Sequence, residues 1–326
     1  MQATPTPAGG AALYGVSCPA VADCWAVGAI PPGTTSSEPL AEHWNGKTWA
    51  VEPVSARSQA HGLLDAVTCV SATSCLAVGA VIPAGASGYR PLAEAWNGTA
   101  WSVQKVPEPA GDNTGTLNAL SCSAAAACTA VGNAASPATT GTLAERWNGR
   151  TWTVQSTHVT GRVPSLIGVS CLSATNWNGS TWTALPAPKP IGTFSGLSAV
   201  SCSSASACLA VGEENTSAST GTALAEHWNG STWTVQPTHV TGAAPYLLGV
   251  SCPSASNCTA VGYQLSSSPE PTLVEHWNGT AWSRQSAPSP GSSENALSGV
   301  SCTTTRCLAV GDEAGSTTRN PLAEAN

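Results

Sequence analysis

The sequence has 326 residues, of which only 9% are charged, and its net charge is −7 with 11 Lys and Arg. This balance argues against nucleic acid and against an anionic membrane surface as partners, because either would call for a basic patch. The 32 Gly and 24 Pro are typical of short strands joined by turns. No apolar run approaches the roughly 18 residues of a membrane span, so we expect no membrane insertion.

The first residues, 1–7, read Met-Gln-Ala-Thr-Pro-Thr-Pro and lack the basic and apolar regions of a signal peptide. The 13 cysteines of the chain nevertheless favour an oxidising compartment. We therefore expect a mature chain that is secreted to the extracellular space.

A repeated phrase organises the whole sequence. It reads Leu-Ala-Glu-His-Trp-Asn-Gly-Ser-Thr-Trp at residues 224–233. Close copies lie at 40–49, 92–101, 143–152 and 273–282, with partial copies at 177–182 and 322–324. Recurrence at a nearly constant period of about fifty residues indicates a repeat architecture.

Each repeat contains four short segments, here named a to d, which turn residues separate. Segment a reads Leu-x-x-Val-Ser-Cys, b reads Cys-x-Ala-Val-Gly, c is the phrase up to its first Trp, and d reads Trp-Thr-Val-Gln. Their β-branched and aromatic residues predict strands. Asn-Gly between c and d predicts a hairpin, because both residues tolerate positive φ.

Complete units are expected at about 13–53, 63–106, 117–155, 197–236 and 248–285, followed by a unit at about 297–325 that stops after c. Residues 1–10 resemble the connection at 104–112. We therefore expect residues 1–10 to supply strand d of the last unit and to close a ring. Four-stranded antiparallel blades closed in this way predict an all-β fold, a β-propeller, with residues 1–326 as a single, monomeric domain.

One unit, at about 166–185, is truncated. Trp228 follows Cys202 by 26 residues, whereas Trp177 follows Cys171 by only 6, so 20 residues are missing from this unit. The deletion removes segment b and most of segment c. Because seven a segments remain, we expect seven blade positions with one rudimentary. The alternative is six blades, with residues of about 160–196 as an irregular insert.

The cysteines come in pairs that flank the tip of each predicted a–b hairpin. The pairs are Cys18/Cys24, Cys69/Cys75, Cys122/Cys128, Cys202/Cys208, Cys252/Cys258 and Cys302/Cys307. The spacing is longer than in zinc knuckles, and no His is placed to complete a zinc site. The pattern predicts six disulfides and leaves Cys171 as a free thiol.

The Glu and Trp of segment c are the candidate ligand-binding residues, one pair in each blade. They are Glu42, Glu94, Glu145, Glu226 and Glu275 with Trp44, Trp96, Trp147, Trp228 and Trp277; Glu324 is the last copy of the glutamate. The Trp side chains are also expected to pack between blades, and a half-buried carboxylate needs hydrogen-bond donors. Equivalent blades give equal environments, whereas acid–base catalysis needs carboxylates in different ones, so we expect no catalytic residue.

The histidines do not form a metal site. His43, His227 and His276 share one repeat position on different blades, His158 and His239 fall in connections, and His61 has no assigned role. The sequence also contains no motif for a catalytic metal, a nucleophile elbow or a phosphate loop. We expect no metal and no cofactor.

The topology predicts two rims with different character. The a–b and c–d turns share a repetitive rim, which is expected to carry the disulfides, whereas the b–c and d–a loops share the opposite rim and vary in sequence. Function on rigid scaffolds usually lies in variable loops, so the variable rim is the candidate binding face. Its chemically distinctive residues are Tyr89, Arg90, Glu213, Glu214, Tyr263, Glu270, Glu294, Asp312 and Glu313.

The c–d turn resembles part of a known motif. Gly230 and Trp233 match the second half of the Asp-box of sialidase-like (BNR) propellers, Ser-x-Asp-x-Gly-x-x-Trp, but Trp228 stands in the place of Asp. The whole repeat is also similar to secreted actinobacterial repeat proteins, a likeness that implies a propeller and no particular activity. A sialidase would need an arginine triad and a Tyr/Glu nucleophile, which the scattered Arg and Tyr do not match.

These observations favour a secreted, non-catalytic binding scaffold whose variable rim binds a protein or a cell-surface glycan. The alternative is a multivalent lectin with one Glu/Trp pocket in each blade, and it requires these side chains to be accessible to solvent. A third hypothesis, a glycan-active hydrolase, requires two carboxylates about 5–10 Å apart across an open cleft.

Overall fold

The computed structural model describes residues 1–31, 37–58, 61–108, 114–136, 140–157, 165–173, 182, 185–188, 194–217, 220–265, 269–315 and 318–325. Regular structure in these residues is strand throughout, apart from one 3-10 turn, η1 (Ser55–Ser58). The strands belong to two compact units, Tyr14–Ala184 and Met1–Leu13 with Leu185–Asn326. None of the described segments forms a helix that could cross a membrane.

The unit Tyr14–Ala184 contains three four-stranded antiparallel sheets, each a propeller blade built in chain order. The first blade consists of β1 (Ala12–Ala20), β2 (Asp23–Ile30), β3 (Glu38–Trp44) and β4 (Trp49–Glu52). The second consists of β5 (His61–Ser71), β6 (Ser74–Ile82), β7 (Arg90–Trp96) and β8 (Trp101–Gln104). The third consists of β9 (Thr114–Ala124), β10 (Ala127–Ala135), β11 (Thr140–Trp147) and β12 (Trp152–Val154).

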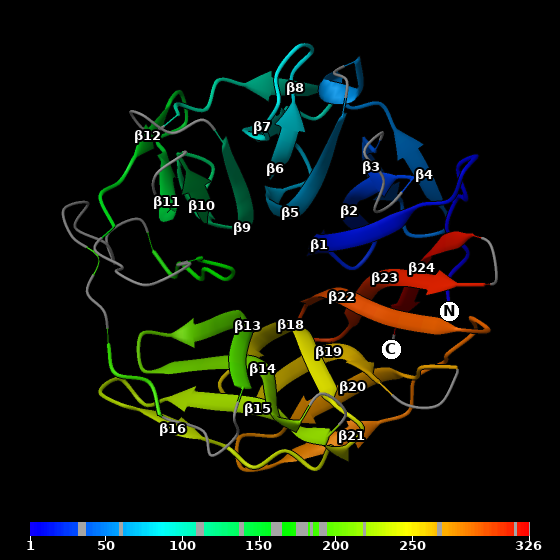
Figure 1. Ribbon diagram of the computed structural model, residues 1–326, viewed down its shortest axis with the longest axis vertical. Helices are drawn as coiled ribbons and strands as arrows, with labels where there is room; N and C mark the ends of the chain where they lie inside the picture. Colours follow the sequence, from blue (N-terminus) through cyan, green and yellow to red (C-terminus); the bar gives the residue numbers. More distant parts are fainter. Residues whose placement is uncertain are drawn as a thin grey trace. The chain divides into compact units, whose positions relative to one another are not determined.

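The other unit contains the remaining three blades (Figure 1). The fourth blade consists of β13 (Phe194–Ser204), β14 (Ala207–Ser217), β15 (Thr220–Trp228) and β16 (Trp233–Val235), with the short β17 (Thr241–Gly242) paired to β15. The fifth consists of β18 (Pro245–Ser254), β19 (Asn257–Gln264), β20 (Thr272–Trp277) and β21 (Trp282–Gln285). The sixth has three strands, β22 (Glu294–Cys302), β23 (Cys307–Ala314) and β24 (Arg319–Ala325).

The prediction of seven blade positions is wrong, because the described residues form six blades. The truncated unit contributes no strand: residues 165–173, which include its segment a, carry no regular structure. The first segment of a unit forms a strand by pairing with the second segment in a hairpin. In the truncated unit the deletion removed that second segment. The blade number agrees with the six-blade alternative. Most of the phrase at 177–182 lies outside the described residues.

The remnant of the truncated unit nevertheless keeps the contacts of a first strand. The backbone N–H of Cys171 donates to Ser121 Oγ at 2.9 Å, as Cys69 N–H donates to Ser17 Oγ at 2.9 Å. Equivalent bonds join Cys252 to Ser201 and Cys302 to Ser251, both at 3.0 Å. The Ser of Val-Ser-Cys therefore links a blade to the following segment a at these four junctions.

The predicted closing strand at residues 1–10 is present only as an isolated bridge. Gln2 pairs antiparallel with Ala323 of β24, and its N–H donates to Ala323 O at 2.9 Å. Thr4 Oγ1 also donates to Pro321 O at 2.8 Å. Figure 1 accordingly places the N-terminus beside β24, but in the described residues this segment forms no strand. The single-domain assignment of residues 1–326 stays a prediction.

Two glycine positions of the repeat are dictated by close approach of the backbone. The Gly of Ala-Val-Gly faces a β-bulge in the first strand, and a Cβ at Gly132 would lie 2.0 Å from Thr116 O. The Gly of Asn-Gly has positive φ, 90° at Gly149, and a Cβ there would lie 2.8 Å from Ala126 Cβ. The c–d turn therefore packs directly on the tip of the a–b hairpin of the same blade.

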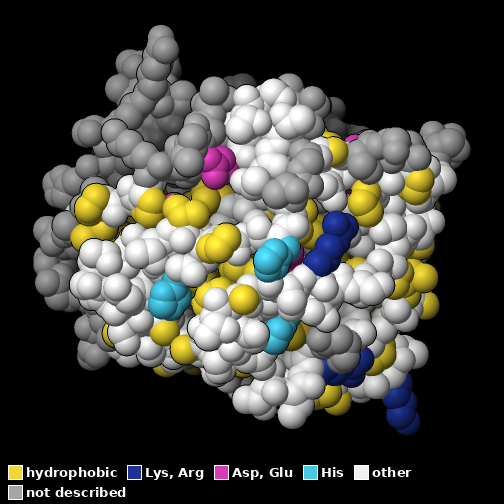
Figure 2. Space-filling model, turned by 90° about the horizontal axis from the view of Figure 1, so that it is seen from below, with side chains coloured by type: hydrophobic (Ala, Val, Ile, Leu, Met, Phe, Trp, Pro, Cys, Tyr) yellow, Lys and Arg dark blue, Asp and Glu magenta, His cyan; other side chains and the backbone are white. Residues whose placement is uncertain are grey.

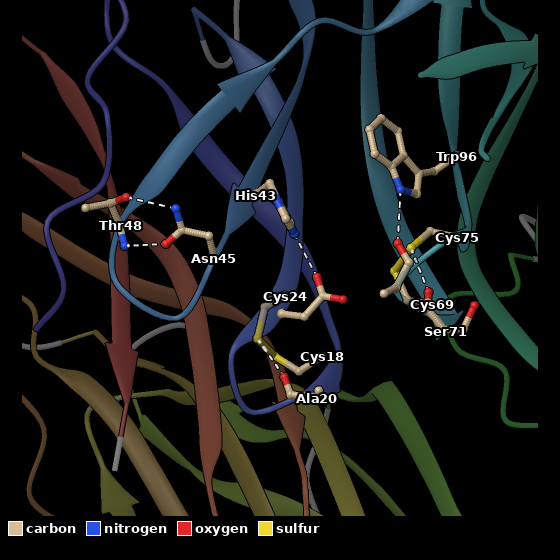
Figure 3. A network of polar contacts seen from close by, with 12 residues as sticks. Cys18, Ala20, Cys24, His43, Asn45, Thr48, Cys69, Ser71, Cys75 and Trp96 are labelled. Carbon is tan, nitrogen blue, oxygen red and sulfur yellow. Dashed lines mark hydrogen bonds and ion pairs between the residues drawn. A yellow bond between two sulfur atoms is a disulfide. The ribbon is translucent and has the colours of Figure 1, made fainter. Parts of the chain in front are cut away.

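Trp and Asn complete this turn-on-tip contact (Figure 3). Trp96 Nε1–H donates to Ala72 O at the tip at 3.1 Å, and Trp147, Trp228 and Trp277 repeat this bond. Asn45 Oδ1 accepts the backbone N–H of Lys47 and Thr48, each at 3.0 Å, which closes the turn. Each residue of Trp-Asn-Gly thus has a separate structural role.

The a–b hairpins carry the six disulfides, which join every predicted cysteine pair: Cys18–Cys24, Cys69–Cys75, Cys122–Cys128, Cys202–Cys208, Cys252–Cys258 and Cys302–Cys307. Cys171 is the one free cysteine in the described residues and is half-buried. Each bridge closes a short loop, so each contributes roughly 2–3 kcal/mol by restricting the unfolded chain.

We expected the repetitive rim to carry the disulfides. The structure instead places most of their cysteines below the surface. In five pairs the first cysteine is half-buried and the second is buried. The exposed fractions of these second cysteines are 2% for Cys24, 3% for Cys75, 2% for Cys128, 8% for Cys208 and 1% for Cys258.

The reason for this burial is the place of the second cysteine in the blade. It lies at the start of the second strand, which first and third strands flank on both sides. Cys75, Cys128 and Cys258 accordingly belong to the apolar clusters between blades, and their partners Cys69, Cys122 and Cys252 pack against the same clusters. The sulfurs are therefore part of the core, and only the residues of the tip between them reach the rim.

Three of the core clusters lie between neighbouring blades and include the Trp that begins a fourth strand. Trp101, Trp152 and Trp282 are each buried in such a cluster. In the first of these clusters Trp101 packs edge-on against Trp25 of the preceding blade, with ring centroids 5.0 Å apart. Burying large aromatic surfaces in this way supplies much of the stabilising free energy of the sheets.

Replacing Gly149 by Ala tests the turn-on-tip contact. We expect a loss of stability of about 2–3 kcal/mol, because positive φ costs an L-residue about 1–2 kcal/mol and the added Cβ also collides with the tip. Gly85→Ala is the matched control, since Gly85 has φ of 81° and nothing within 4 Å of a Cβ. Urea denaturation, monitored by Trp fluorescence, measures the stability of both variants. Equal losses of stability in the two variants would refute the contact.

Alkylation of the unreduced, denatured protein tests the disulfide pattern. We expect mass spectrometry to find one adduct, on Cys171, since the other 12 cysteines are paired. Reduction before alkylation should raise the count to all 13 cysteines of the chain. Thirteen adducts without reduction would contradict the pairing.

Candidate functional site

The repeated glutamates lie on the third strand of each blade and are buried. The exposed fraction is 0% for Glu42, Glu94, Glu145 and Glu275, 2% for Glu226 and 8% for Glu324. The Trp partners Trp44, Trp147 and Trp277 are 4–7% exposed, while Trp96 and Trp228 are half-buried. Each of these rings stacks obliquely on the Trp of the next strand, with centroids 5.4–5.8 Å apart.

Most of these carboxyl groups lack hydrogen-bond donors. Both oxygens of Glu42, Glu145 and Glu275 have no partner among the described residues, and the same holds for one oxygen of Glu226 and one of Glu324. Burial raises the pKa of Glu42 and Glu145 to about 8. Burial also raises the pKa of Glu275 and Glu324 to about 7. An unpaired buried carboxyl is more stable when neutral, because desolvation penalises its charged form.

Glu94 is the exception, because the preceding blade supplies donors. The backbone N–H groups of Ser55 and Ala56 in η1 donate to its two oxygens at 2.9 and 2.7 Å. Burial raises the pKa of Glu94, and these two bonds lower it. Identical residues at equivalent positions thus have different surroundings, because the connection in front of each blade differs in sequence.

The histidines of the same strands have structural contacts. His43 Nε2 lies 2.7 Å from Asp23 Oδ1, and the His43 ring stacks on Trp25 at 4.5 Å. His276 Nε2 lies 3.0 Å from Asn257 Oδ1. The described residues contain no group of three or more His, Cys, Asp or Glu that could hold a metal ion.

A different set of side chains gathers at the variable rim of the unit that contains Leu185–Asn326. The set, here named the rim cluster, comes from the fourth, fifth and sixth blades and lies where second strands end and first and third strands begin. Its members are Glu213, Tyr246, Tyr263, Glu270, Glu294, Asp312 and Arg319.

Two stacked tyrosines form the apolar part of the rim cluster. Tyr246 and Tyr263 are paired across β18 and β19, and their rings are nearly parallel with centroids 5.1 Å apart. Asn215 Nδ2 donates to Tyr246 Oη at 3.4 Å. Burial raises the pKa of Tyr263, and Tyr246, Glu270, Glu213 and Glu294 raise it further. The Tyr263 hydroxyl therefore stays protonated at neutral pH.

The acidic part surrounds the tyrosines from three blades. Glu213 lies in the second half of β14, paired with Gly196 of β13, where a Cβ would lie only 2.8 Å from a Glu213 carboxyl oxygen. Burial raises the pKa of Glu270, Glu294 raises it further, and Arg319 lowers it. Asn295, 1% exposed, donates to Glu270 O at 2.8 Å and accepts Gly291 N–H at 2.6 Å. The loop that carries Glu270 is therefore anchored to the start of β22.

Arg319 is the cation of the rim cluster, and it is already paired. Its guanidinium contacts Glu294 through one terminal nitrogen and Asp312 through the other. Asp312 is 5% exposed, while Arg319 and Glu294 keep nearly half of their side chains in solvent. The cluster therefore holds four acidic side chains against one described cation, which leaves an excess of negative charge around the Tyr pair.

The structure brings together five of the predicted rim residues and separates the others. Glu213, Tyr263, Glu270, Glu294 and Asp312 belong to the rim cluster. Arg90 lies in the other unit, where it pairs with Glu108 at 3.0 Å. Tyr89 precedes it in the chain and is exposed. Glu214 and Glu313 lie next to cluster residues in sequence, on the opposite faces of their strands.

Sequence reasoning missed Tyr246, Arg319 and the supporting Asn295. Tyr246 and Asn295 stand near the start of first strands and Arg319 starts a third strand, so their strand positions could have indicated the variable rim. The bond from Asn295 to Glu270, for example, depends on how neighbouring blades pack. Figure 2 shows one face of the molecule, on which uncharged side chains predominate and few Asp and Glu side chains are visible.

Comparison with known proteins supports the fold and leaves the activity open. No protein-family model matches the sequence, and no curated protein matches it. Among solved structures, YCF48 bound to D1 peptide is 10% identical with a TM-score of 0.54, covering 98% of this chain and 92% of that one. The Trypanosoma rangeli sialidase in complex with 2,3-difluorosialic acid is 9% identical with a TM-score of 0.53, covering 98% and 54%.

A third structure, the Hadza microbial sialidase Hz136, is 10% identical with a TM-score of 0.52 and covers 95% of this chain and 65% of that one. The chain thus spans about half to two thirds of these sialidases. At such identities the similarity shows the fold alone: a β-propeller, as the repeat predicted, related in architecture to sialidase-like propellers.

Replacing Glu145 by Gln tests the neutral state of the unpaired glutamates. Between about pH 5 and 8 the folded protein keeps a proton on Glu145 that the unfolded chain releases, because the folded pKa is about 8. Stability must therefore fall as pH rises through this window. We expect E145Q to reduce that slope, by up to about 1.4 kcal/mol per pH unit, and to be more stable than wild type at pH 8.

Glu94→Gln is the matched control at the same repeat position. It removes the charge that accepts two backbone N–H groups, so we expect a loss of about 1–3 kcal/mol at pH 8. Urea denaturation at pH 5, 6.5 and 8 measures both variants. An unchanged pH slope in E145Q would show that Glu145 is ionised in the folded protein.

Proposed function

We propose that the protein is a secreted, non-catalytic binding module and that its rim cluster recognises a cationic segment of a partner protein. The observation that carries this proposal is the Tyr246–Tyr263 stack, flanked by Glu213, Glu270 and Glu294. The six disulfides agree with an oxidising, extracellular location. A monomer remains our expectation.

The chemistry of the cluster favours a cation. Aromatic faces attract Lys and Arg through their negative quadrupole, and the excess carboxylates add a longer-range attraction that steers a charged partner to its site. Because Arg319 is engaged with Glu294 and Asp312, Glu213 and Glu270 are the carboxylates left to pair with an incoming cation. The anchored Glu270 loop keeps this arrangement preorganised, which lowers the entropic cost of binding.

The arrangement gives less support to catalysis. The sialidase chemistry implied by the Asp-box resemblance would need an arginine triad, and the described residues of the rim cluster include a single arginine that two carboxylates neutralise. A glycosidase would need one carboxyl held as an acid opposite another held as a base across the substrate. We therefore propose a binding role.

The lectin alternative finds less support in the same structure. It requires a solvent-accessible Glu and Trp in each blade, whereas Glu42, Glu145 and Glu275 are fully buried and their Trp partners nearly so. The Trp indole N–H groups are used for hydrogen bonds to the hairpin tips. A glycan partner would then have to bind at the rim instead of at the repeated residues.

Binding of a cationic peptide tests the proposal. A fluorescein-labelled peptide in which Arg and Lys alternate with Gly should bind the wild type, and the double variant E213Q/E270Q should bind about tenfold more weakly, because each carboxylate contributes about 0.5–1 kcal/mol. E214Q/E313Q is the matched control, since it also removes two negative charges, from the opposite faces of β14 and β23. Fluorescence anisotropy at low and high salt measures the affinities.

Three results would contradict the proposal. The first is equal affinity of E213Q/E270Q and E214Q/E313Q for the peptide, which would show that net charge alone attracts it. The second is affinity that does not fall with added salt, since exposed charge pairs are screened. The third is a glycan-array signal that survives in E213Q/E270Q while the peptide does not bind, which would support a glycan partner.

A further inference from the structure

A pocket of about 250 Å³ lies between the third blade and the remnant of the truncated unit, residues 165–173. The third blade lines it with Thr129 and Arg146, among others, and the remnant lines it with Cys171 and the residues on either side. These residues all belong to the compact unit Tyr14–Ala184. The rim cluster lies in the other unit, so the pocket is a separate feature of the molecule.

Cys171 brings a free thiol to the wall of this pocket. In the six blades the cysteine of Val-Ser-Cys, or of its variant in the same place, is bonded to a second cysteine at the start of the second strand. The deletion removed that second strand from the truncated unit. Because Cys171 N–H still donates to Ser121 Oγ at 2.9 Å, the residue keeps the place of a first cysteine without a second one to pair with.

Thr129 gives a second, independent indication that a group belongs in this pocket. Its side chain is 5% exposed and lines the pocket, and its hydroxyl has no hydrogen-bond partner among the described residues. At the same repeat position in the fifth blade, Thr259 Oγ1 lies 3.3 Å from Sγ of Cys307, the second cysteine of the next blade. The Thr129 hydroxyl therefore points to the place that a second cysteine would hold in the truncated unit.

The lining of the pocket favours a small anionic group. Arg146 stands directly opposite Thr129 in the register of β10 and β11, so the two side chains lie on one face of the sheet. Among the described lining residues Arg146 is the one charged side chain, and Ser123 and Ser173 add hydroxyl groups. A guanidinium carries five N–H donors, so Arg146 can bind a carboxylate in addition to its present contacts.

We propose that Cys171 is a modification site, at which a small thiol that bears a carboxylate is bound as a mixed disulfide inside this pocket. The external sulfur takes the place of the second cysteine that the deletion removed, beside the Thr129 hydroxyl. The carboxylate of the bound group pairs with Arg146. A buried polar group without a partner is costly, and the bound group removes that cost for Thr129.

The modification is a thiol–disulfide exchange with a small external disulfide. The Cys171 thiolate attacks one sulfur of that disulfide, and the new sulfur–sulfur bond forms while the old one breaks. The other half leaves as a thiolate and takes up the proton that Cys171 released. Cys171 is oxidised and the leaving half is reduced, so the exchange needs no other oxidant. Small disulfides persist in the oxidising environment that the six disulfides of the chain also require.

The position of the thiol favours a small molecule over a second protein chain. Cys171 is half-buried, and its pocket of about 250 Å³ is smaller than the roughly 300–1,000 Å³ of sites for drug-sized ligands. A small group can enter such a pocket whole, whereas a cysteine of another chain would have to bring its backbone along. A disulfide-linked dimer is therefore the competing outcome, which the experiment below distinguishes.

Equilibration of the full-length protein with two matched reagents tests the proposal. Dithiodipropionate, mixed with its thiol, offers a carboxylate, and cystamine, mixed with cysteamine, offers an ammonium group on a chain of similar length. Mass spectrometry of the intact, unreduced protein gives the fraction modified and hence the exchange constant, and peptide mapping gives the site. A peptide with the sequence of residues 166–173 is the unfolded reference, because Cys171 is its one cysteine.

We expect dithiodipropionate to modify Cys171 in the protein with an exchange constant roughly tenfold or more above that of the peptide, the effect of one hydrogen bond to a charged group. Cystamine should show no such gain, although the net charge of −7 favours a cation in general. Arg146→Gln should remove the preference for the carboxylate. Arg150→Gln is the matched control, since it removes the same charge from an exposed turn. Thr129→Val should lower the exchange constants of both reagents alike.

Four results would overturn the proposal. They are no modification of the folded protein, equal exchange constants for protein and peptide, a preference for cystamine, and a disulfide-linked dimer as the main product on a non-reducing gel. A preference for dithiodipropionate that persists in folded R146Q would remove Arg146 from the site. Circular dichroism establishes that each variant is folded. The comparison of the two reagents on the wild type needs no variant, so it decides the question even where a variant fails to fold.

Discussion

The contact between the c–d turn and the a–b hairpin tip is the interaction on which each complete blade depends. Gly149 can lie on Ala126 only because it has no Cβ, and Trp147 donates its indole N–H to the Ala125 carbonyl of the same tip. This contact fixes the third and fourth strands against the disulfide-closed hairpin formed by the first two. It also sets the position of the Trp that begins the fourth strand and packs between blades.

The same construction explains why charged side chains are scarce and where they occur. Both faces of the strands are covered by neighbouring blades, so the repeated Glu loses its solvent and burial raises its pKa. Glu94 meets two donors in the described structure, because η1 turns the N–H groups of Ser55 and Ala56 toward it. At the variable rim, by contrast, Arg319 pairs with the buried Asp312 and with Glu294, which stays about half exposed.

The strands, the hairpins and the disulfides could be predicted from the sequence because each depends on residues close together in the chain. Cys202 and Cys208 flank one tip, and Asn229-Gly230 makes one turn. The blade number could not be predicted from the count of first segments. Ser165–Ser173 keeps the hydrogen bond of Cys171 to Ser121, yet a first segment without a second one has no hairpin partner and forms no strand.

The sequence by itself determined the repeat unit, its four antiparallel strands, the cysteine pairs and the rim on which variable residues lie, because periodicity and turn chemistry are local properties. Only the tertiary structure decided which variable residues meet. Asn215 of the fourth blade donates to Tyr246 of the fifth, and Asn295 of the sixth donates to Glu270, so these contacts arise from the packing of one blade on the next. It also decided that the repeated Glu, most of the repeated Trp and the second cysteine of most pairs are interior, because burial is set by what a neighbouring blade covers.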